Sequence, residues 1–258
     1  MSPTNVLMVV ILCLILGANI GLAQGVYVTA IAGYGLGAGT QEIDFNATFT
    51  GTTSSYEGIY GSLGEGFKFG VSAGYMFDKN LGAELGLSYW LGKAFEASLI
   101  AAMPAGYKWS GSGFVAVPSI VVSANTKTIS PYARFGLVLA ILKVKRESRD
   151  AFSGQTIERT LEETGNLAFG YAGALGIVVP AGGAVDFFAE VALYSVTYSP
   201  SQEEITKYAV NGVDQKPSLV RTVYKYEDSY NNSTSDVGLA VRRPFSSIGI
   251  VVGARVNL

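Results

Sequence analysis

The stretch from Phe67 to Gly92, FKFGVSAGYMFDKNLGAELGLSYWLG, decides the fold. In residues 67–77 every odd position is aromatic or aliphatic, and the even positions are Lys, Gly, Ser, Gly and Met. The tripeptide Asp78-Lys79-Asn80 is a turn signal, and the alternation then resumes over 81–92. A period of two, with one apolar face and one small or polar face, is typical of strands in a membrane barrel. The stretch therefore predicts a β-hairpin of this kind.

Six further segments follow the same pattern, which brings the predicted number of strands to eight, an even number as barrels require. The segment 114–123 (FVAVPSIVVS) is apolar on both faces, so its phase stays open. The other segments alternate clearly. The six segments are 26–36, 114–123, 131–141, 167–179, 185–195 and 248–258.

The connections between these segments alternate in length. Those near 78–80, 124–128 and 180–184 are short. The long ones are 37–66, 92–113, 143–166 and 199–246. Outer-membrane barrels have short periplasmic turns and long outer loops, whereas a soluble sandwich has no reason to sort its loops in this way. We expect a short helix or hairpin in the charged third loop and a flexible tip at 230–235.

The composition fits a barrel in a membrane. Hydrophobic residues make up 49% of the chain, yet beyond the N-terminus no apolar run reaches the ~18 residues that a membrane helix needs. A closed barrel satisfies its backbone groups between neighbouring strands and is the other structure that spans a bilayer. The net charge of −2 and the lack of a basic stretch argue against a nucleic-acid partner.

The N-terminus has the pattern of a secretory signal peptide. Residues 6–17 (VLMVVILCLILG) are apolar, and the small residues Gly21 and Ala23 precede a cleavage site ahead of Gln24. We expect residues 1–23 to be a cleaved signal peptide and 24–258 to form the barrel domain. An uncleaved membrane anchor is the alternative. Cys13 is the one cysteine, so the mature chain forms no disulfide.

Outward-facing aromatic residues sort to the two ends of the predicted strands, as in the aromatic girdles of membrane barrels. At the outer end these are Tyr34, Phe67, Phe69, Tyr89, Phe169 and Tyr171, and at the inner end Tyr75, Phe77 and Phe187.

The opposite face carries charged residues that a barrel would enclose. These are Lys68, Glu84, Arg134, Asp186, Glu190 and Arg255. Buried charges must pair, because an unpaired one is costly. An ion or proton path, or a gate, is one interpretation. We favour a structural plug of ion pairs, because side chains fill the interior of an eight-stranded barrel.

Catalysis and metal binding have little support. The chain contains no histidine, so neither a Ser-His nor a His-Asp pair exists. Glu84 and Glu190 are a carboxylate pair, but on an inner wall such pairs are more often structural. Zinc sites of the Cys and His type are excluded, while calcium on the loop carboxylates at 203–204 or 227–228 stays an unspecific alternative. We predict no enzyme and no cofactor.

The exported N-terminus, the eight strands and the final SSIGIVVGARVNL (246–258) resemble the small outer-membrane barrels of Gram-negative bacteria, the OmpA-transmembrane and OmpX-like group. The resemblance implies an all-β, eight-stranded antiparallel up-and-down transmembrane β-barrel with long outer loops and a polar network in its lumen. It also implies outer-membrane lipid and the barrel-assembly machinery as partners. That machinery reads a terminal aromatic residue in the family, where this chain has Leu258. We expect no periplasmic domain after strand eight.

The function that this implies is structural, with recognition through the extracellular loops of a surface ligand or a host or matrix partner. One alternative is a narrow, porin-like channel or an OmpW-like carrier for small or hydrophobic molecules. A second is a soluble, lipocalin-like barrel that holds a ligand. A soluble barrel turns its apolar face inward, and the aromatic residues on the apolar face here favour lipid outside.

Overall fold

The computed structural model describes residues 25–50, 52–100, 105–126, 128–229 and 236–258. The predicted signal peptide and the tip at 230–235 lie outside these residues. Eight long strands pair antiparallel, each with the next, and the last pairs with the first to close a barrel. They are β1 (Val26–Gly37), β4 (Gly66–Met76), β5 (Leu81–Gly92), β7 (Ala105–Ser123), β8 (Ser130–Phe152), β10 (Ala168–Gly182), β11 (Val185–Tyr198) and β17 (Ser247–Asn257). The predicted all-β, eight-stranded up-and-down barrel is confirmed.

Burial alternates along the barrel strands in the phase that the sequence predicts. In β4, Phe67, Phe69 and Val71 are exposed while Lys68 and Ser72 are buried. The structure also settles the phase of β7, which the sequence left open. There Phe114, Ile120 and Val122 face outward, while the valines between them point into the barrel. The β5 and β8 neighbours fix this phase, because both already carry a polar inner face.

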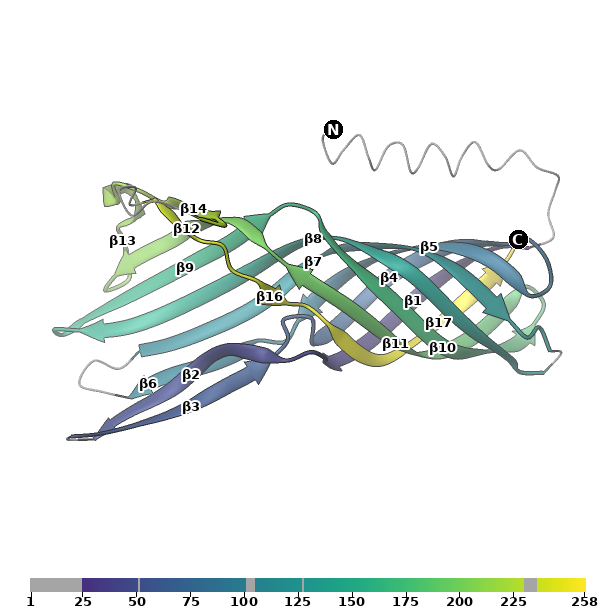
Figure 1. The fold of residues 1–258 in the computed structure, drawn as a ribbon, viewed down its shortest axis with the longest axis horizontal. Helices are drawn as coiled ribbons and strands as arrows, with labels where there is room; N and C mark the ends of the chain where they lie inside the picture. The colour runs from purple at the N-terminus through teal and green to yellow at the C-terminus, as the bar shows by residue number, and fades with distance from the viewer. Residues whose placement is uncertain (1–24, 51, 101–104, 127, 230–235) are drawn as a thin grey trace.

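The three short connections lie at one end of the barrel, here called the turn end, together with the C-terminus (Figure 1). In the β4–β5 turn, the Asp78 carboxylate accepts hydrogen bonds from the backbone N–H groups of Asn80 and Leu81, at 2.7 and 2.8 Å. Asn80 also donates from its side chain to the carbonyl of Ser123 in β7. These bonds fix the turn that the sequence predicted here.

At the other end the long connections are mostly strand rather than loop, and they form what we call the extension (Figure 1). The third long connection forms a hairpin, one of the two structures that the sequence predicted there. Its strands are the part of β8 from Lys143 to Phe152 and β9. The strands not in the barrel ring are β2 (Gln41–Thr50), β3 (Thr53–Gly61), β6 (Phe95–Ile100), β9 (Gln155–Gly165), β12 (Pro200–Val210), β13 (Val213–Asp214), β14 (Val223–Glu227), β15 (Val237–Leu239) and β16 (Arg243–Pro244), with a 3₁₀ turn η2 (Lys216–Ser218).

The extension is an open sheet rather than a tube. Its strands pair in the order β3, β2, β6, β7, β8, β9, β12, β14, β15. Among the described residues, β3 pairs with β2 and with no further strand, so it forms a free edge. The molecule thus consists of a closed tube that continues into a sheet with open edges.

No helix in the described part of the chain has the length and hydropathy needed to span a membrane.

Candidate functional site

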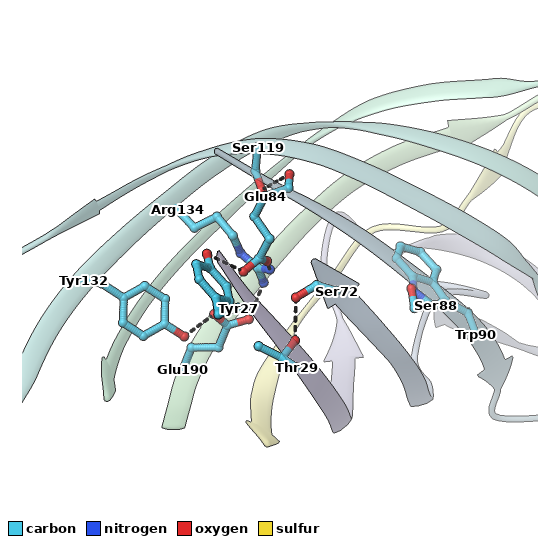
Figure 2. Close-up of polar contacts among 10 residues, drawn as sticks. All are labelled: Tyr27, Thr29, Ser72, Glu84, Ser88, Trp90, Ser119, Tyr132, Arg134 and Glu190. Carbon is cyan, nitrogen blue, oxygen red and sulfur yellow. Dashed lines mark hydrogen bonds and ion pairs between the residues drawn. The ribbon is translucent and has the colours of Figure 1, made fainter. Parts of the chain in front are cut away.

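The centre of the lumen holds an ion triad made by three strands spaced around the ring. Arg134 of β8 lies between Glu84 of β5 and Glu190 of β11 (Figure 2). One guanidinium nitrogen lies 2.5 Å from Glu84 Oε1 and the other lies 2.5 Å from Glu190 Oε1. The side chains of Glu84, Arg134 and Glu190 are 6%, 13% and 1% exposed. The fork of an arginine bridges two carboxylates in this way because its donors are fixed in one plane.

Two tyrosines, Tyr27 of β1 and Tyr132 of β8, donate hydrogen bonds to the glutamates of the triad. The Tyr27 hydroxyl donates to Glu84 Oε2 at 3.0 Å, and the Tyr132 hydroxyl donates to Glu190 Oε2 at 2.6 Å. A glycine makes room for each ring, because a Cβ at Gly74 would overlap Tyr27 and a Cβ at Gly176 would lie 2.7 Å from Tyr132. The sequence places both tyrosines on inward positions, but nothing in it pairs them with the glutamates.

The other three predicted lumen residues lie apart from the triad. The Lys68 ammonium donates to the carbonyl of Gly64 at 3.0 Å and lies 4.8 Å from the Trp90 ring centroid. Asp186 accepts a hydrogen bond from Asn257, at 2.8 Å. Arg255 stacks on the Tyr27 ring, 4.1 Å from its centroid. The structure therefore brings together three of the six residues. Lys68 lies on the side of the extension, and Asp186 and Arg255 lie on the side of the turn end.

Two apolar side chains are buried where the barrel meets the extension. Leu63 and Phe245, from the two connections that enter the tube, are 1% and 0% exposed. The backbone N–H of Leu63 donates to the carbonyl of Pro244 at 2.8 Å, and that of Phe245 donates to the carbonyl of Val196 at 3.0 Å. The Phe245 ring packs against Gly111, where a Cβ would lie 2.6 Å from it. We call Leu63 and Phe245 the stopper. Because both residues lie in predicted loops, the sequence offered no signal for them.

The extension has a polar cluster of its own, centred on Trp109 of β7. The guanidinium groups of Arg146 and Arg243 lie 4.9 and 4.8 Å from its ring centroid. The indole N–H donates to Asp44 Oδ2 at 2.7 Å. Arg243 forms a bidentate pair with Glu163, at 2.9 and 2.5 Å. We call this group the tryptophan cluster, and it connects β7, β8, β9 and β16 to β2.

Glu203 of β12 belongs to the same cluster, since it accepts hydrogen bonds from Arg146 and from the Tyr226 hydroxyl, both at 3.2 Å. Burial and the charges of Glu163 and Glu203 raise the pKa of Tyr226. Burial lowers the pKa of Arg243, but the hydrogen bonds and charge of Glu163 outweigh it and the net shift is upward. Both groups therefore keep their ordinary protonation states at neutral pH.

Calcium at Glu203–Glu204 has no support in this geometry. Glu203 is occupied by Arg146 and Tyr226, and Glu204 lies 3.3 Å from the Lys216 ammonium. No group of three or more His, Cys, Asp or Glu suited to a metal ion occurs within the described ranges.

The nine aromatic residues expected in girdles all lie exposed on the outer wall. Near the extension, Tyr34 meets Phe67 edge-to-face, with ring centroids 4.9 Å apart. At the turn end Tyr75 and Phe77 meet in the same manner, at 5.6 Å. Phe114 and Phe135 are further exposed aromatics on this wall, and Phe114 was missed because the phase of its strand was open.

Comparison with known proteins gives structural neighbours but no family. No family model matches the chain. No curated protein matches it either. Among solved structures, it is similar to Neisserial surface protein A (NspA), with 15% identity, a TM-score of 0.41 and coverage of 92% of this chain and 100% of that one. It is also similar to Ail, the attachment invasion locus protein of Yersinia pestis, with 11% identity, a TM-score of 0.31 and coverage of 90% and 97%. The fold described above rests on the strand pairings.

Proposed function

We propose that the protein is an outer-membrane barrel with an occluded lumen, which presents its extension at the cell surface for binding. The observation that carries the proposal is the polarity of the wall. Phe135, Leu175 and Ile250 are more than 60% exposed on the outside, while Glu84 and Glu190 are buried inside. Soluble proteins rarely expose an apolar surface this continuous, and hydrocarbon is the solvent that suits it.

A soluble, lipocalin-like barrel would have the opposite polarity, with an apolar interior for its ligand. The wall can be tested with single cysteines at Val191, which faces outward, and Ala192, which faces inward. We expect a carbene released in the bilayer from a lipid-soluble diazirine, which inserts into the neutral S–H bond, to label Val191→Cys and not Ala192→Cys. Labelling of Ala192→Cys alone would place the apolar face inside and contradict the membrane role. Heat-modifiable migration in detergent supplies the control for folding.

The triad and the stopper support an occluded lumen rather than a porin-like channel or an OmpW-like carrier. Arg134 bridges the tube from β8 to β5 and β11, and Phe245 fills it near the extension. We expect no steady single-channel current in planar bilayers. A steady single-channel current in the wild type would favour the channel instead.

The extension is the part suited to recognition, and in its β2–β3 hairpin most side chains of β3 are exposed. Phe45, Phe49 and Tyr56 are exposed and pack edge-to-face, with centroids 5.9 and 6.0 Å apart. Residues 41–61 contain three carboxylates and no Lys or Arg. One side of β3 is unpaired, and the strand contains no proline and a single charged residue, Glu57, so it is a template for an added strand. A basic, extended segment of a surface partner fits this hairpin best.

The surface role is tested by binding to host cells and to immobilised matrix proteins. The variant Phe45→Ser/Tyr56→Ser removes the aromatic contacts, and we expect it to lose most of the binding. Lys93→Ser, on the barrel rim, is the matched control and should bind as the wild type does. Equal binding by all three proteins would contradict a role for the hairpin.

Export and assembly complete the proposal. Cleavage ahead of Gln24 would release the mature barrel, and N-terminal sequencing of protein from the outer membrane tests it. We propose that the barrel-assembly machinery inserts the chain through β17, which Leu258 follows.

A further inference from the structure

The turn end of the barrel contains a cavity of about 740 Å³. Its wall comes from the β4–β5 turn and from β7, β8, β10, β11 and β17. Tyr132, whose hydroxyl binds Glu190, lines it. The triad therefore lies at the inner end of this cavity, and the short turns surround the other end. We call this space the vestibule.

Arg255 lines the vestibule with donors that lack acceptors. It forms no hydrogen bond or ion pair with any residue that the structure describes, and its guanidinium carbon lies 4.1 Å from the centroid of the Tyr27 ring. Its Nε is buried without a partner. A buried donor without an acceptor is unfavourable, and the planar fork of arginine matches a carboxylate. The free donors of Arg255 therefore point to an anionic group of this shape.

A carboxylate of opposite charge lies next to Arg255 without neutralising it. Asp186 is the direct cross-strand neighbour of Arg255, and it lines the same cavity. It accepts a hydrogen bond from Asn257 and forms no ion pair within 4.0 Å with the described residues. Cross-strand neighbours have Cβ atoms about 5 Å apart, so one small molecule with two opposite charges can reach both side chains.

The rest of the lining is both polar and apolar. Ser123, Asn125 and Ser130 offer hydroxyl and amide groups, and Val121 and Val178 offer apolar contact. Lys79 and Asp78 at the rim cancel each other in charge. A simple anion would gain from Arg255 but meet Asp186. A zwitterion satisfies both groups at once.

We propose that the vestibule is a binding site for a small zwitterion of the α-amino-acid class, with its carboxylate on Arg255, its ammonium group on Asp186 and its side chain against Val121 and Val178. The site is separate from the binding surface on the extension and does not depend on it. The ligand enters from the turn end and stays between the short turns and the triad.

The experiment titrates the intact protein in detergent micelles with three probes. They are leucine, leucine amide, which lacks the carboxylate, and 4-methylpentanoate, which lacks the ammonium group. We expect leucine to bind with millimolar affinity and to shift the ¹⁵N resonance of Arg255 Nε. Loss of the carboxylate should weaken binding by about tenfold or more, and loss of the ammonium group by about threefold.

Variants separate the two charges. Arg255→Gln should behave like removal of the ligand carboxylate, and Asp186→Asn like removal of its ammonium group. Arg159→Gln, an equal loss of charge in the extension, is the matched control and should bind leucine unchanged. Arg255→Lys keeps the charge without the fork and should be intermediate, so it replaces Arg255→Gln if that variant fails to fold.

Two outcomes would overturn the proposal. One is an Arg255 resonance in the wild type that does not move with leucine. The other is leucine amide binding as well as leucine. If 4-methylpentanoate binds as tightly as leucine, the site takes carboxylates in general and the role of Asp186 is refuted.

Discussion

The lumen triad and the tryptophan cluster are two buried groups of arginines and glutamates that contribute differently to the structure around them. The triad lies inside a ring in which every strand is hydrogen-bonded on both sides. The tryptophan cluster lies in an open sheet, where β16 has only a two-residue pairing with β11. In the tube, backbone pairing already fixes the strands, and the three charged side chains pair with one another across the interior. In the extension, the side chains must hold the strands together.

Buried ion pairs are therefore needed to hold the strands together in the extension but not in the tube. A closed barrel has no edges, so loss of its internal charges should leave the ring intact. The extension has edges and short pairings, so loss of its charges should separate its strands.

The largest effect is expected for Arg134→Gln. The substitution leaves Glu84 and Glu190 buried without their cation, and breaking a buried pair in this way costs about 3–5 kcal/mol. Urea unfolding in lipid vesicles measures the loss. The triple variant Glu84→Gln/Arg134→Gln/Glu190→Gln removes all three charges and should recover most of the stability. A single variant as stable as the wild type would show that water, rather than Arg134, satisfies the glutamates.

A smaller and more local effect is expected for Arg243→Gln. Glu163 loses a bidentate partner, and hydrogen bonds to a charged group are worth about 1.5–3 kcal/mol. Hydrogen exchange should accelerate in β9 and β12 and stay unchanged in β1 and β4. Uniform acceleration over the whole chain would contradict the independence of the two regions. Lys108→Gln is the control, because its pair with Glu96 is exposed.

Gly74→Ala tests the fit of the triad inside the tube. The added Cβ overlaps the Tyr27 ring, so Tyr27 must move away from Glu84, and overpacking of this kind costs about 1–3 kcal/mol. Gly173→Ala is the matched control, because the nearest heavy atom to its Cβ would be the Arg134 carbonyl oxygen at 4.0 Å. We expect the control to change the free energy of unfolding by less than about 0.5 kcal/mol. Equal losses would place the cost in the strand backbone.

The smallest effect is a pH dependence at the turn end. Hydrogen bonds from the backbone of Asn80 and Leu81 lower the pKa of the Asp78 carboxyl. Its contribution to stability is therefore complete above the unfolded pKa of about 3.9, and it is lost as the pH falls through the lower folded value. An NMR titration of the Asp78 carboxyl carbon should show a midpoint below the unfolded value. A midpoint at or above it would mean that the turn does not hold the charge.

The sequence by itself determined the barrel. Alternation in 67–92 and in the other segments indicated which side chains face outward, because successive residues of a strand point to opposite faces. That rule also placed Glu84, Arg134 and Glu190 inside. It failed for the phase of 114–123, where both faces are apolar and only the pairing with β5 and β8 decides.

Only the tertiary structure decided which inward groups meet. Strand order and register around the ring bring Glu84, Arg134 and Glu190 together. Asp186 and Arg255 form no ion pair with each other, although they are direct cross-strand neighbours. The stopper joins the connections that precede β4 and β17, and the tryptophan cluster joins Asp44 of β2 to Arg243 of β16 through Trp109. Alternation is a local property of each strand, so a sequence can reveal the face on which a residue lies. Its partners depend on how distant strands close into one ring, which no local pattern records.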